Sequence, residues 1–323
     1  MSIIAPTFSP SLKPTDFEKL LNELPKAPFW ETKELSHYDG FWFPTPFMKP
    51  IVKFRSTFKA REDDVLLAST MKTGTTWLKA LSLCIMQENH PTDDQQHADI
   101  LTLGNPHSHV PTVEAMVYSD KDPRVDIYNP TTPRLLHTHL PYTVLPDSIK
   151  QSPCKIVYIA RNPKDTLISS WHFFNTILRP NQDPLPLEKA LDSFCSGVYQ
   201  YGPFFEHVVE FWLESQRRPN KILFVKYEDM KSDPKGQVTR IAEFMGRPLA
   251  GEEEVEDVLW RCSLKRLKSL EVNKSDHHFN HIPNKSFFRK GDVGDWRRYL
   301  TYEMEEQINQ LCRTKLEPFG LFL

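Results

Sequence analysis

The 323-residue sequence lacks the features that mark several classes of protein. No stretch approaches the roughly 18 uninterrupted apolar residues of a membrane helix. The N-terminal sequence, M-S-I-I-A-P-T-F-S-P, has neither a charged region nor a sustained apolar core, so no signal peptide is expected. No internal repeat or linker-like segment divides the chain, which favours one domain over two. The expectation is a cytoplasmic protein of one domain that does not associate with membranes.

Cysteine is scarce, and its pattern excludes a cysteine framework. The five cysteines are odd in number, widely spaced and set in apolar or helical contexts: Cys84, Cys154, Cys195, Cys262 and Cys312. Such a pattern is typical of reduced, buried thiols in a cytosolic protein and not of disulfides or a zinc site.

Charge of one sign is not in excess either. The net charge is −2 and the sequence pI is about 6.6, with 39% hydrophobic and 25% charged residues. These values are ordinary for a soluble globular enzyme and give no general attraction to nucleic acid or anionic lipid. Any anion must therefore be bound by a local site.

One stretch predicts such a site. The apolar run 65–68 indicates a buried strand, and Leu78 and Leu81 begin a helical spacing. Between them lies a polar loop with Gly74, where the backbone can turn closely. Free N–H groups and the helix dipole favour anions there, and Lys72 adds positive charge. Further donors are the hydroxyls of Thr73, Thr75 and Thr76. An ordinary strand–turn–helix corner with an incidental lysine remains the alternative, because the order differs from that of the P-loop, G-x-x-x-x-G-K-[ST].

Three further strands are predicted, at 134–141, 155–160 and 221–225. Strands that alternate with helices indicate an α/β fold with a central parallel sheet flanked by helices. Open parallel sheets bind ligands at the carboxyl ends of their strands. We therefore expect the residues at the four strand ends to converge on one crevice: Lys72, His139, Arg161 and Tyr227.

Outside these strands the signals are weaker. Residues 1–64 are predicted to be an N-terminal extension that packs on an α/β domain of residues 65–323. Segment 29–47 of this N-terminal extension is rich in Phe, Trp and Pro and is expected to be an irregular aromatic clasp. Residues 1–14 are expected to be loosely packed, and 89–133 and 271–295 to be polar loops. Helices are predicted at 17–24, 166–178, 187–197, 203–217, 234–245, 252–260, 263–270 and from residue 302.

Several motifs together resemble one known family. K-T-G-T-T-W, from Lys72 to Trp77, resembles the phosphosulfate-binding loop of the cytosolic sulfotransferases, P-K-[ST]-G-T-T-W, with Met71 in place of proline. R-N-P-K-D-x-x-x-S, from Arg161 to Ser169, resembles the second cofactor signature of that family. R-K-G-D-V-G-D-W at 289–296 resembles the third signature, and Y-E-D-M at 227–230 matches as well. N-P-H-S-H-V-P at 105–111 resembles plant members.

The resemblance implies a single-domain α/β sulfotransferase with a P-loop-like phosphosulfate-binding loop. Its reaction would move a sulfuryl group from 3′-phosphoadenylyl sulfate (PAPS) to a hydroxyl of a small acceptor, leaving adenosine 3′,5′-bisphosphate (PAP), without a metal. Arg161 and Ser169 would hold the 3′-phosphate, since a guanidinium suits phosphate through paired hydrogen bonds. The implied cofactor-binding residues are Lys72, Thr73, Gly74, Thr75, Thr76, Trp77, Arg161, Ser169, Tyr227, Arg289, Lys290 and Gly291.

His139, in T-H-L-P, is the candidate base. A lone histidine beside a strand is more often a hydrogen-bonded core residue, but the family carries its catalytic histidine in this context. A phenol with a pKa of about 10 stays protonated at neutral pH, so an imidazole near pKa 6.5 can remove its proton. Lys72 would stabilise charge on the leaving phosphate. Many animal relatives have lysine at the position of His137. In this chain the local positive charge is therefore weaker, or depends on the protonation of His137.

Three other functions compete with this interpretation. A metal site could use the pairs His107/His109 and His137/His139 or the cluster at 277–281, although no carboxylate or cysteine has a matching spacing. A P-loop kinase would need a Mg²⁺-binding Asp after a strand and the G-K-[ST] order, and neither is present. A non-catalytic nucleotide-binding protein would have no need of His139.

The acceptor and the oligomeric state are less defined. Aromatic residues suit a flat apolar acceptor such as a flavonol, although desulfoglucosinolates, steroids or hydroxyjasmonate fit the same residues: Trp42, Phe47, Tyr142, Phe173 and Phe204. A monomer is expected, because the animal dimer signature is reduced to Arg297, Thr301, Tyr302 and Glu306. No nucleic-acid or membrane partner is expected.

Overall fold

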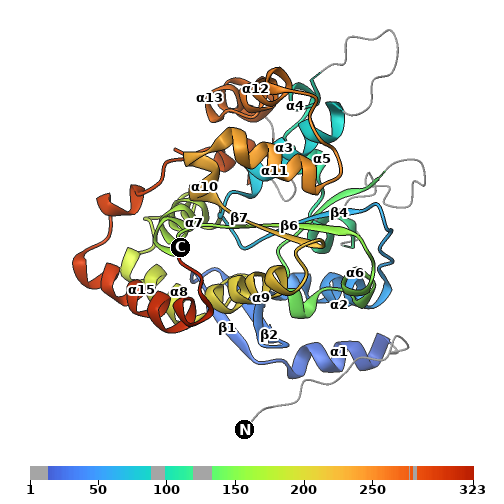
Figure 1. Cartoon of the computed structure of the whole chain (residues 1–323). Coiled ribbons are helices and arrows are strands. Elements are labelled where there is room, and N and C mark those ends of the chain that lie inside the picture. Colours follow the sequence, from blue (N-terminus) through green and yellow to red (C-terminus); the bar gives the residue numbers. More distant parts are fainter. Residues whose placement is uncertain (1–13, 89–98, 119–132, 276, 279–281) are drawn as a thin grey trace.

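The computed structural model describes residues 14–88, 99–118, 133–275, 277–278 and 282–323 (Figure 1). The predicted loose segment at the N-terminus, two parts of the predicted loop 89–133, and His281 lie outside this part. The strands are β1 (Lys26–Phe29), β2 (Lys33–Tyr38), β3 (Phe41–Pro44), β4 (Val65–Ser69), β5 (Leu135–Thr138), β6 (Lys155–Ala160), β7 (Ile222–Lys226), β8 (His277–His278) and β9 (Ile282–Pro283). The helices are α1 (Pro14–Glu23), α2 (Met48–Thr57), α3 (Thr75–Glu88), α4 (Ile100–Leu103), α5 (Pro106–His109), α6 (Asp147–Gln151), α7 (Pro163–Leu178), α8 (Leu187–Ser196), α9 (Phe204–Arg217), α10 (Tyr227–Ser232), α11 (Pro234–Phe244), α12 (Glu252–Arg261), α13 (Leu264–Ser269), α14 (Glu271–Lys274) and α15 (Tyr302–Lys315).

The four predicted buried strands form one parallel sheet in the order β5-β4-β6-β7, which confirms the α/β fold class. In the register, Ala68 is opposite Thr138 and Ser69 is opposite Ile159. On β7, Lys226 is opposite Ala160. The carboxyl ends of all four strands are therefore level, and the loops that follow them emerge at one edge.

Alternate residues of the strands face opposite sides of the sheet. Leu66, Ile156 and Tyr158 belong to one buried cluster, together with residues of α9 and of the N-terminal segment. Leu67 and Val157 belong to a second cluster with residues of α3, α11 and α12. This alternation is the strand period of two. Helices consequently cover both faces, with α3 and α11 on one side and α2 and α9 on the other (Figure 1).

The N-terminal aromatic segment is not irregular, and that prediction was wrong. Strands β1, β2 and β3 form a three-stranded antiparallel sheet. The hairpin from β2 to β3 turns at Asp39 (φ +52°) and Gly40 (φ +86°). Asp-Gly between apolar residues favours a tight hairpin turn, since both residues tolerate positive φ. This sheet packs on the central core through Phe29, Leu35 and Phe43.

Several predicted helix boundaries were also wrong. Helix α7 begins at Pro163, and not at 166, because the side chain of Asn162 accepts from the N–H of Lys164 and proline suits the first helical position. Helix α1 begins at Pro14, and the unexpected helix α10 follows β7 directly. The segment 271–295 contains α14, a two-stranded ladder of β8 and β9, and a 3₁₀ turn at Asn284–Phe287. By contrast, α9 buries the predicted apolar stripe that includes Phe204 and Val208.

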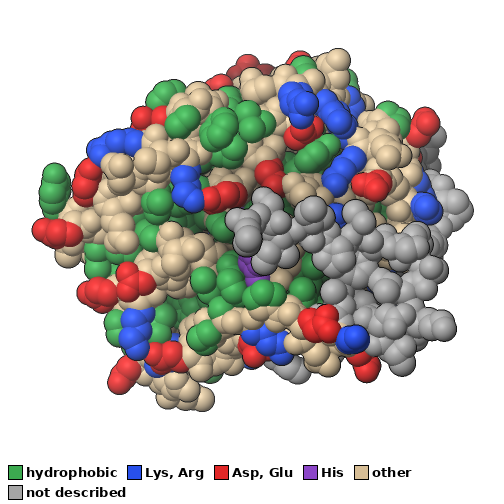
Figure 2. Space-filling view, turned by 90° about the horizontal axis from the view of Figure 1, so that it is seen from below, with side chains coloured by type: hydrophobic (Ala, Val, Ile, Leu, Met, Phe, Trp, Pro, Cys, Tyr) green, Lys and Arg blue, Asp and Glu red, His purple; other side chains and the backbone are tan. Residues whose placement is uncertain are grey.

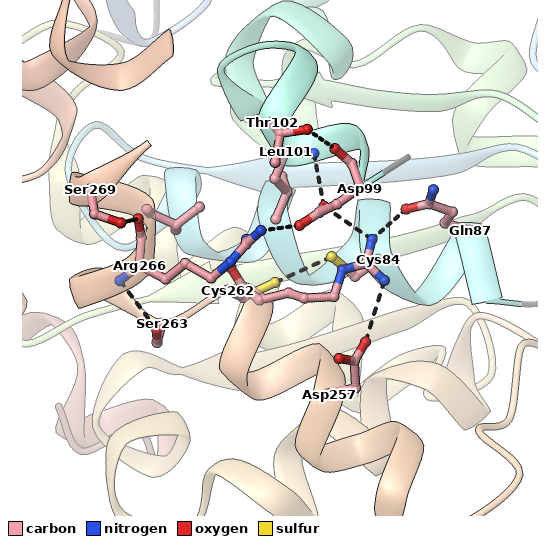
Figure 3. Close-up of polar contacts among 12 residues, drawn as sticks. Cys84, Gln87, Asp99, Leu101, Thr102, Asp257, Cys262, Ser263, Arg266 and Ser269 are labelled. Atoms are coloured by element: carbon pink, nitrogen blue, oxygen red, sulfur yellow. Dashed lines mark hydrogen bonds and ion pairs between the residues drawn. The ribbon is translucent and has the colours of Figure 1, made fainter. Parts of the chain in front are cut away.

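The five cysteines are free thiols, as predicted, although Cys195 and Cys312 are only half-buried. Cys84 on α3 and Cys262 after α12 place their sulfur atoms 3.5 Å apart (Figure 3). Beside them, Asp99 caps α4 through the N–H of Leu101 and forms ion pairs with Arg261 (3.2 Å) and Arg266. These contacts fix α12 and α13 against α3 and α4 (Figure 3).

Within the described residues, every helix is too short or too polar to cross a membrane.

Candidate active site

A cavity of about 710 Å³ lies at the carboxyl edge of the parallel sheet. The ends of β4, β5, β6 and β7 contribute Lys72, His139, Arg161 and Tyr227 to its lining, as the sequence predicted. Other predicted site residues that line it are Gly74, Thr75, Thr76, Trp77, Ser169, Arg289 and Gly291. Thr73 and Lys290 do not line it.

The loop between β4 and α3 depends on two residues with positive φ. Lys72 has φ +66° and Gly74 has φ +116°. A Cβ atom on Gly74 would lie 2.8 Å from the side chains of Ile159 and Tyr227, so only glycine fits. The hydroxyl of Thr73 donates to the carbonyl of Ile159 (3.0 Å) and thus ties the loop to β6. Any contact of Thr73 with an anion must therefore come from its backbone N–H.

Lys72 is half-buried and has no carboxylate partner among the described residues. Its Nζ lies 4.0 Å from the ring centre of Phe173 and 5.7 Å from that of Phe287. Burial, followed by repulsion from Arg161 and Arg289, lowers the pKa of Lys72 to about 7. A bound anion would reverse this effect, because a nearby negative charge favours the ammonium form.

Arg161 and Arg289 leave donors unsatisfied in the described structure. The Nε atoms of both are buried without a hydrogen-bond partner. Each guanidinium is fixed at its other end: Nη2 of Arg161 donates to the carbonyl of Asp292 (2.7 Å), and Nη1 of Arg289 donates to Asp295 (2.6 Å). Buried unsatisfied donors are costly, and two fixed guanidinium groups suit an oxyanion such as phosphate.

Asp165 brings the two arginine-bearing segments together, and sequence reasoning missed it. Its Oδ2 accepts from the N–H of Gly294 (2.7 Å) and its Oδ1 from the N–H of Trp296 (3.1 Å). Asp165 is fully buried and also lies 3.8 Å from Arg161. It therefore clamps the loop that carries Arg289 onto the first turn of α7. The only available signal was its place in R-N-P-K-D.

Lys290 is held outside the lining of the cavity. Its Nζ forms an ion pair with Asp295 (2.8 Å), the same carboxylate that holds Arg289. Lys290 thus supports the loop, while Tyr227 secures the next residue by donating from its hydroxyl to the carbonyl of Gly291 (2.8 Å).

His139 is oriented by the backbone of the neighbouring strand. Its Nδ1 lies 2.9 Å from the carbonyl oxygen of Ser69, which can only accept, so Nδ1 carries the proton and Nε2 carries the lone pair. The side chain lines the cavity. Burial lowers its pKa to about 3, against the hydrogen bond to Ser69 that raises it. His139 is neutral in the free protein and can accept a proton at Nε2.

His137 does not supply positive charge to the cavity. Its ring meets that of His139 at 4.4 Å, but His137 is fully buried and its two nitrogens contact Thr112 and Ser69, each at 3.0 Å. Burial holds its pKa well below the ordinary value. The dependence on protonation of His137 considered above is therefore not supported.

The same contacts weigh against the metal hypothesis. Both ring nitrogens of His107 are also hydrogen-bonded, to Thr76 (2.8 Å) and Lys79 (3.2 Å). In the part of the chain that the structure describes, no three His, Cys, Asp or Glu side chains are grouped as metal ligands. His281 lies outside that part.

Two buried charges behind the site were also missed. Lys79 on α3 and Glu114 in the π-helical turn Val113–Val117 are both fully buried. Glu114 accepts from the N–H of His139 (2.8 Å) and from the hydroxyl of Thr138 (2.9 Å), and burial raises its pKa to about 7. The available signal for Lys79 was its position within the apolar stretch 77–81 of α3.

The acceptor side is less aromatic than predicted. Phe173 lines the cavity and faces Phe287 at 5.7 Å, and Phe287 stacks on His107 at 4.2 Å. The other four candidates do not line it. They pack in or against the core: Trp42, Phe47, Tyr142 and Phe204.

Comparison with known proteins decides the family. A sequence model described as the sulfotransferase domain matches residues 62–320. Cytosolic sulfotransferase 5 of Arabidopsis thaliana is 40% identical over 308 residues and covers 94% of both chains; cytosolic sulfotransferase 6 is 39% identical over 309. This chain belongs to the plant cytosolic sulfotransferase family. It is therefore an enzyme, a PAPS-dependent sulfotransferase.

Solved structures agree with this sulfotransferase fold. A sulphotransferase from Arabidopsis thaliana is 31% identical, with a TM-score of 0.74 over 99% of both chains. Mouse SULT7A1, complexed with PAP, is 30% identical, with a TM-score of 0.66, and covers 87% of this chain and 94% of its own.

Proposed function

We propose that this sulfotransferase transfers the sulfuryl group of PAPS to a hydroxyl of a flavonol or related phenolic acceptor. The observation that carries the proposal is one cavity lined by Lys72, His139, and two arginines whose Nε atoms have no partner among the described residues. Its volume of about 710 Å³ is within the usual range for small-molecule sites.

The residues fit a doubly anionic nucleotide. Arg161, Ser169, Arg289 and the N–H of Gly291 would hold the 3′-phosphate, and Tyr227 and Trp77 would lie beside the adenosine. The loop 72–76 would hold the 5′-phosphosulfate at the N-terminus of α3. PAP in the mouse relative supports PAPS as co-substrate and PAP as product.

In the proposed mechanism, His139 acts as the base. As the acceptor oxygen forms its bond to sulfur and the bond from sulfur to the phosphate oxygen breaks, Nε2 of His139 takes the hydroxyl proton. Lys72 stabilises the negative charge that grows on the leaving phosphate. The carbonyl of Ser69 keeps the imidazole in the required tautomer.

A flat, uncharged aromatic acceptor is supported by the cavity wall. Phe173 and Phe287 offer ring surfaces beside Lys72. Hydrophobic side chains also gather near the middle of the face shown in Figure 2. Aromatic acceptors stack favourably on such rings. The proposal includes a cytosolic location, supported by the names of the relatives, and a monomer, supported by the degraded dimer signature.

An acceptor screen tests this proposal. The purified enzyme would be given PAPS labelled in the sulfuryl group with a flavonol, a steroid, a desulfoglucosinolate or hydroxyjasmonate. We expect the highest kcat/KM with the flavonol. A higher value with another class would overturn the acceptor assignment, and no transfer to any hydroxyl would leave a nucleotide-binding protein as the better interpretation.

A further inference from the structure

Lys79 is a fully buried ammonium directly beneath the phosphosulfate-binding loop. It lies on α3, one turn after Thr75 and Thr76. Its Nζ contacts the carbonyl of Val110 (2.9 Å), Thr112 Oγ1 (3.2 Å) and Nδ1 of His107 (3.2 Å). Burying an ammonium is costly unless each of its protons is bound, and three acceptors meet that need.

The ammonium fixes the direction of the hydrogen bonds around it. In its ammonium form Lys79 has protons but no lone pair, so Nδ1 of His107 is then the acceptor. The other nitrogen of His107 then carries the proton and donates to Thr76 Oγ1, 2.8 Å away. The hydroxyl proton of Thr76 remains to be donated elsewhere, and Thr76 lines the cavity.

A second chain of hydrogen bonds leaves Lys79 through Thr112. Thr112 Oγ1 accepts from Lys79 and has one proton of its own, which it can donate to Nδ1 of His137 (3.0 Å); in that arrangement His137 carries its proton at Nε2. His137 then donates from Nε2 to Ser69 Oγ (3.0 Å), and Ser69 donates to Thr75 Oγ1 (2.7 Å). Thr75 also lines the cavity and keeps its own proton to donate.

We propose that Lys79 is a positioning residue that polarises two hydrogen-bond relays and makes the hydroxyls of Thr75 and Thr76 donors to the 5′-phosphosulfate group. The relays run Lys79–His107–Thr76 and Lys79–Thr112–His137–Ser69–Thr75. This inference rests on the proposed function, since it assigns a donor set to the co-substrate. Donors linked to a charged group bond more strongly than neutral ones, and chained hydrogen bonds reinforce one another.

The groups around Lys79 agree with this role. His107 on α5 and His137 on β5 face it as acceptors of the two relays, and His139 lies just beyond His137. Glu114 is the carboxylate that favours the charged form of Lys79. Burial lowers the pKa of Lys79 to about 7 in the free protein, and an anion on the two threonines would favour the ammonium form.

The test compares two nucleotides, PAP and adenosine 3′-monophosphate, by calorimetric titration. The proteins are the wild type, Lys79→Met, Thr76→Val and the double variant, with Lys235→Met, an exposed lysine, as control. We expect Lys79→Met and Thr76→Val each to weaken PAP binding about tenfold and the double variant to lose little more, while binding of the monophosphate is unchanged. Lys235→Met should match the wild type.

Two results would overturn the relay. One is full additivity of Lys79→Met and Thr76→Val, and the other is an equal loss for both nucleotides. If Lys79→Met does not fold, Thr76→Val and Thr76→Ser decide: the serine variant should retain PAP affinity, and equal affinities of the two variants would contradict the relay. A wild type that binds PAP no better than the monophosphate would contradict the proposed function instead.

Discussion

At the scale of single residues, His139 carries the chemistry. Its protonated Nδ1 donates to the carbonyl of Ser69, and its backbone N–H donates to the carboxylate of Glu114. Its backbone carbonyl accepts from Nε2 of His207 (2.9 Å). These contacts fix the backbone and the Nδ1 side of a ring that lines the cavity, so the lone pair is on Nε2. The base is thus preorganised before any acceptor binds.

Replacing His139 by alanine should lower kcat about 10²- to 10⁴-fold, because general base catalysis is lost. PAP affinity should stay within about twofold of the wild type, because the nucleotide is held by other residues. Steady-state kinetics and calorimetry measure the two effects, with His37→Ala, on strand β2 and outside the cavity lining, as control. Unchanged turnover would remove His139 from the role of base.

Lys72 should take up a proton when PAP binds. Its pKa is about 7 in the free protein, so at pH 8 it is largely neutral until the anion raises that pKa. Titrations in two buffers of different ionisation enthalpy measure the uptake, which should fall by about one proton in Lys72→Met. The same variant should lower kcat about 10²- to 10³-fold. Equal proton uptake by both proteins would contradict this account of Lys72.

At the scale of elements, the site depends on loops that follow parallel strands. The loop after β4 is tied to β6 through Thr73, and the loop with Arg289 is tied to α7 through Asp165. Each loop is therefore held by a hydrogen bond to a neighbouring strand or helix. Substitutions that remove these hydrogen bonds should affect ligand binding more than folding.

The Asp165 clamp can be tested directly. Asp165→Asn removes the negative charge beside Arg161 and replaces one of the acceptors for Gly294 and Trp296 by a donor. We expect PAP affinity to fall about tenfold, because a hydrogen bond to a charged group is lost and the loop with Arg289 loosens. Calorimetry measures this, with the exposed Asp147→Asn as control. Wild-type affinity in Asp165→Asn would show that the loop needs no clamp.

Sequence reasoning found the central elements because their signals are local. The runs 65–68 and 156–160 are apolar, bounded by polar residues, and buried in the fold. The motifs then placed Lys72, His139 and Arg161 at strand ends. It missed β1 to β3, where aromatic residues obscured the Asp39-Gly40 turn signal. It also missed Asp165, Lys79 and Glu114, because their partners are distant in the sequence and only tertiary packing brings them together.

At the scale of the whole molecule, buried neutral histidines link stability to pH. His207 is fully buried, contacts Tyr158 (3.1 Å), and has its pKa lowered to about 4 by burial. The unfolded chain protonates this residue near pKa 6.5, so it binds more protons than the native state between these values. The stability from neutral His207 is therefore present above about pH 6.5 and is lost as the pH falls toward 4.

His207→Gln should remove this pH dependence. The wild type should lose about 2 kcal/mol more free energy of unfolding than the variant between pH 8 and pH 5, from the two pKa values. Urea unfolding at a series of pH values measures the difference. Parallel stability curves for the two proteins would show that His207 is not held neutral.

The central claim is that four strand ends and the Arg289 loop surround one nucleotide, with His139 facing the reacting sulfur. A crystal structure with PAP and a flavonol tests it most directly. We predict the 3′-phosphate on Arg161, Ser169 and Arg289, the 5′-phosphate on the loop 72–76, and a flavonol hydroxyl within hydrogen-bond distance of His139 Nε2. PAP bound away from these residues, or an acceptor hydroxyl out of reach of His139, would contradict the account.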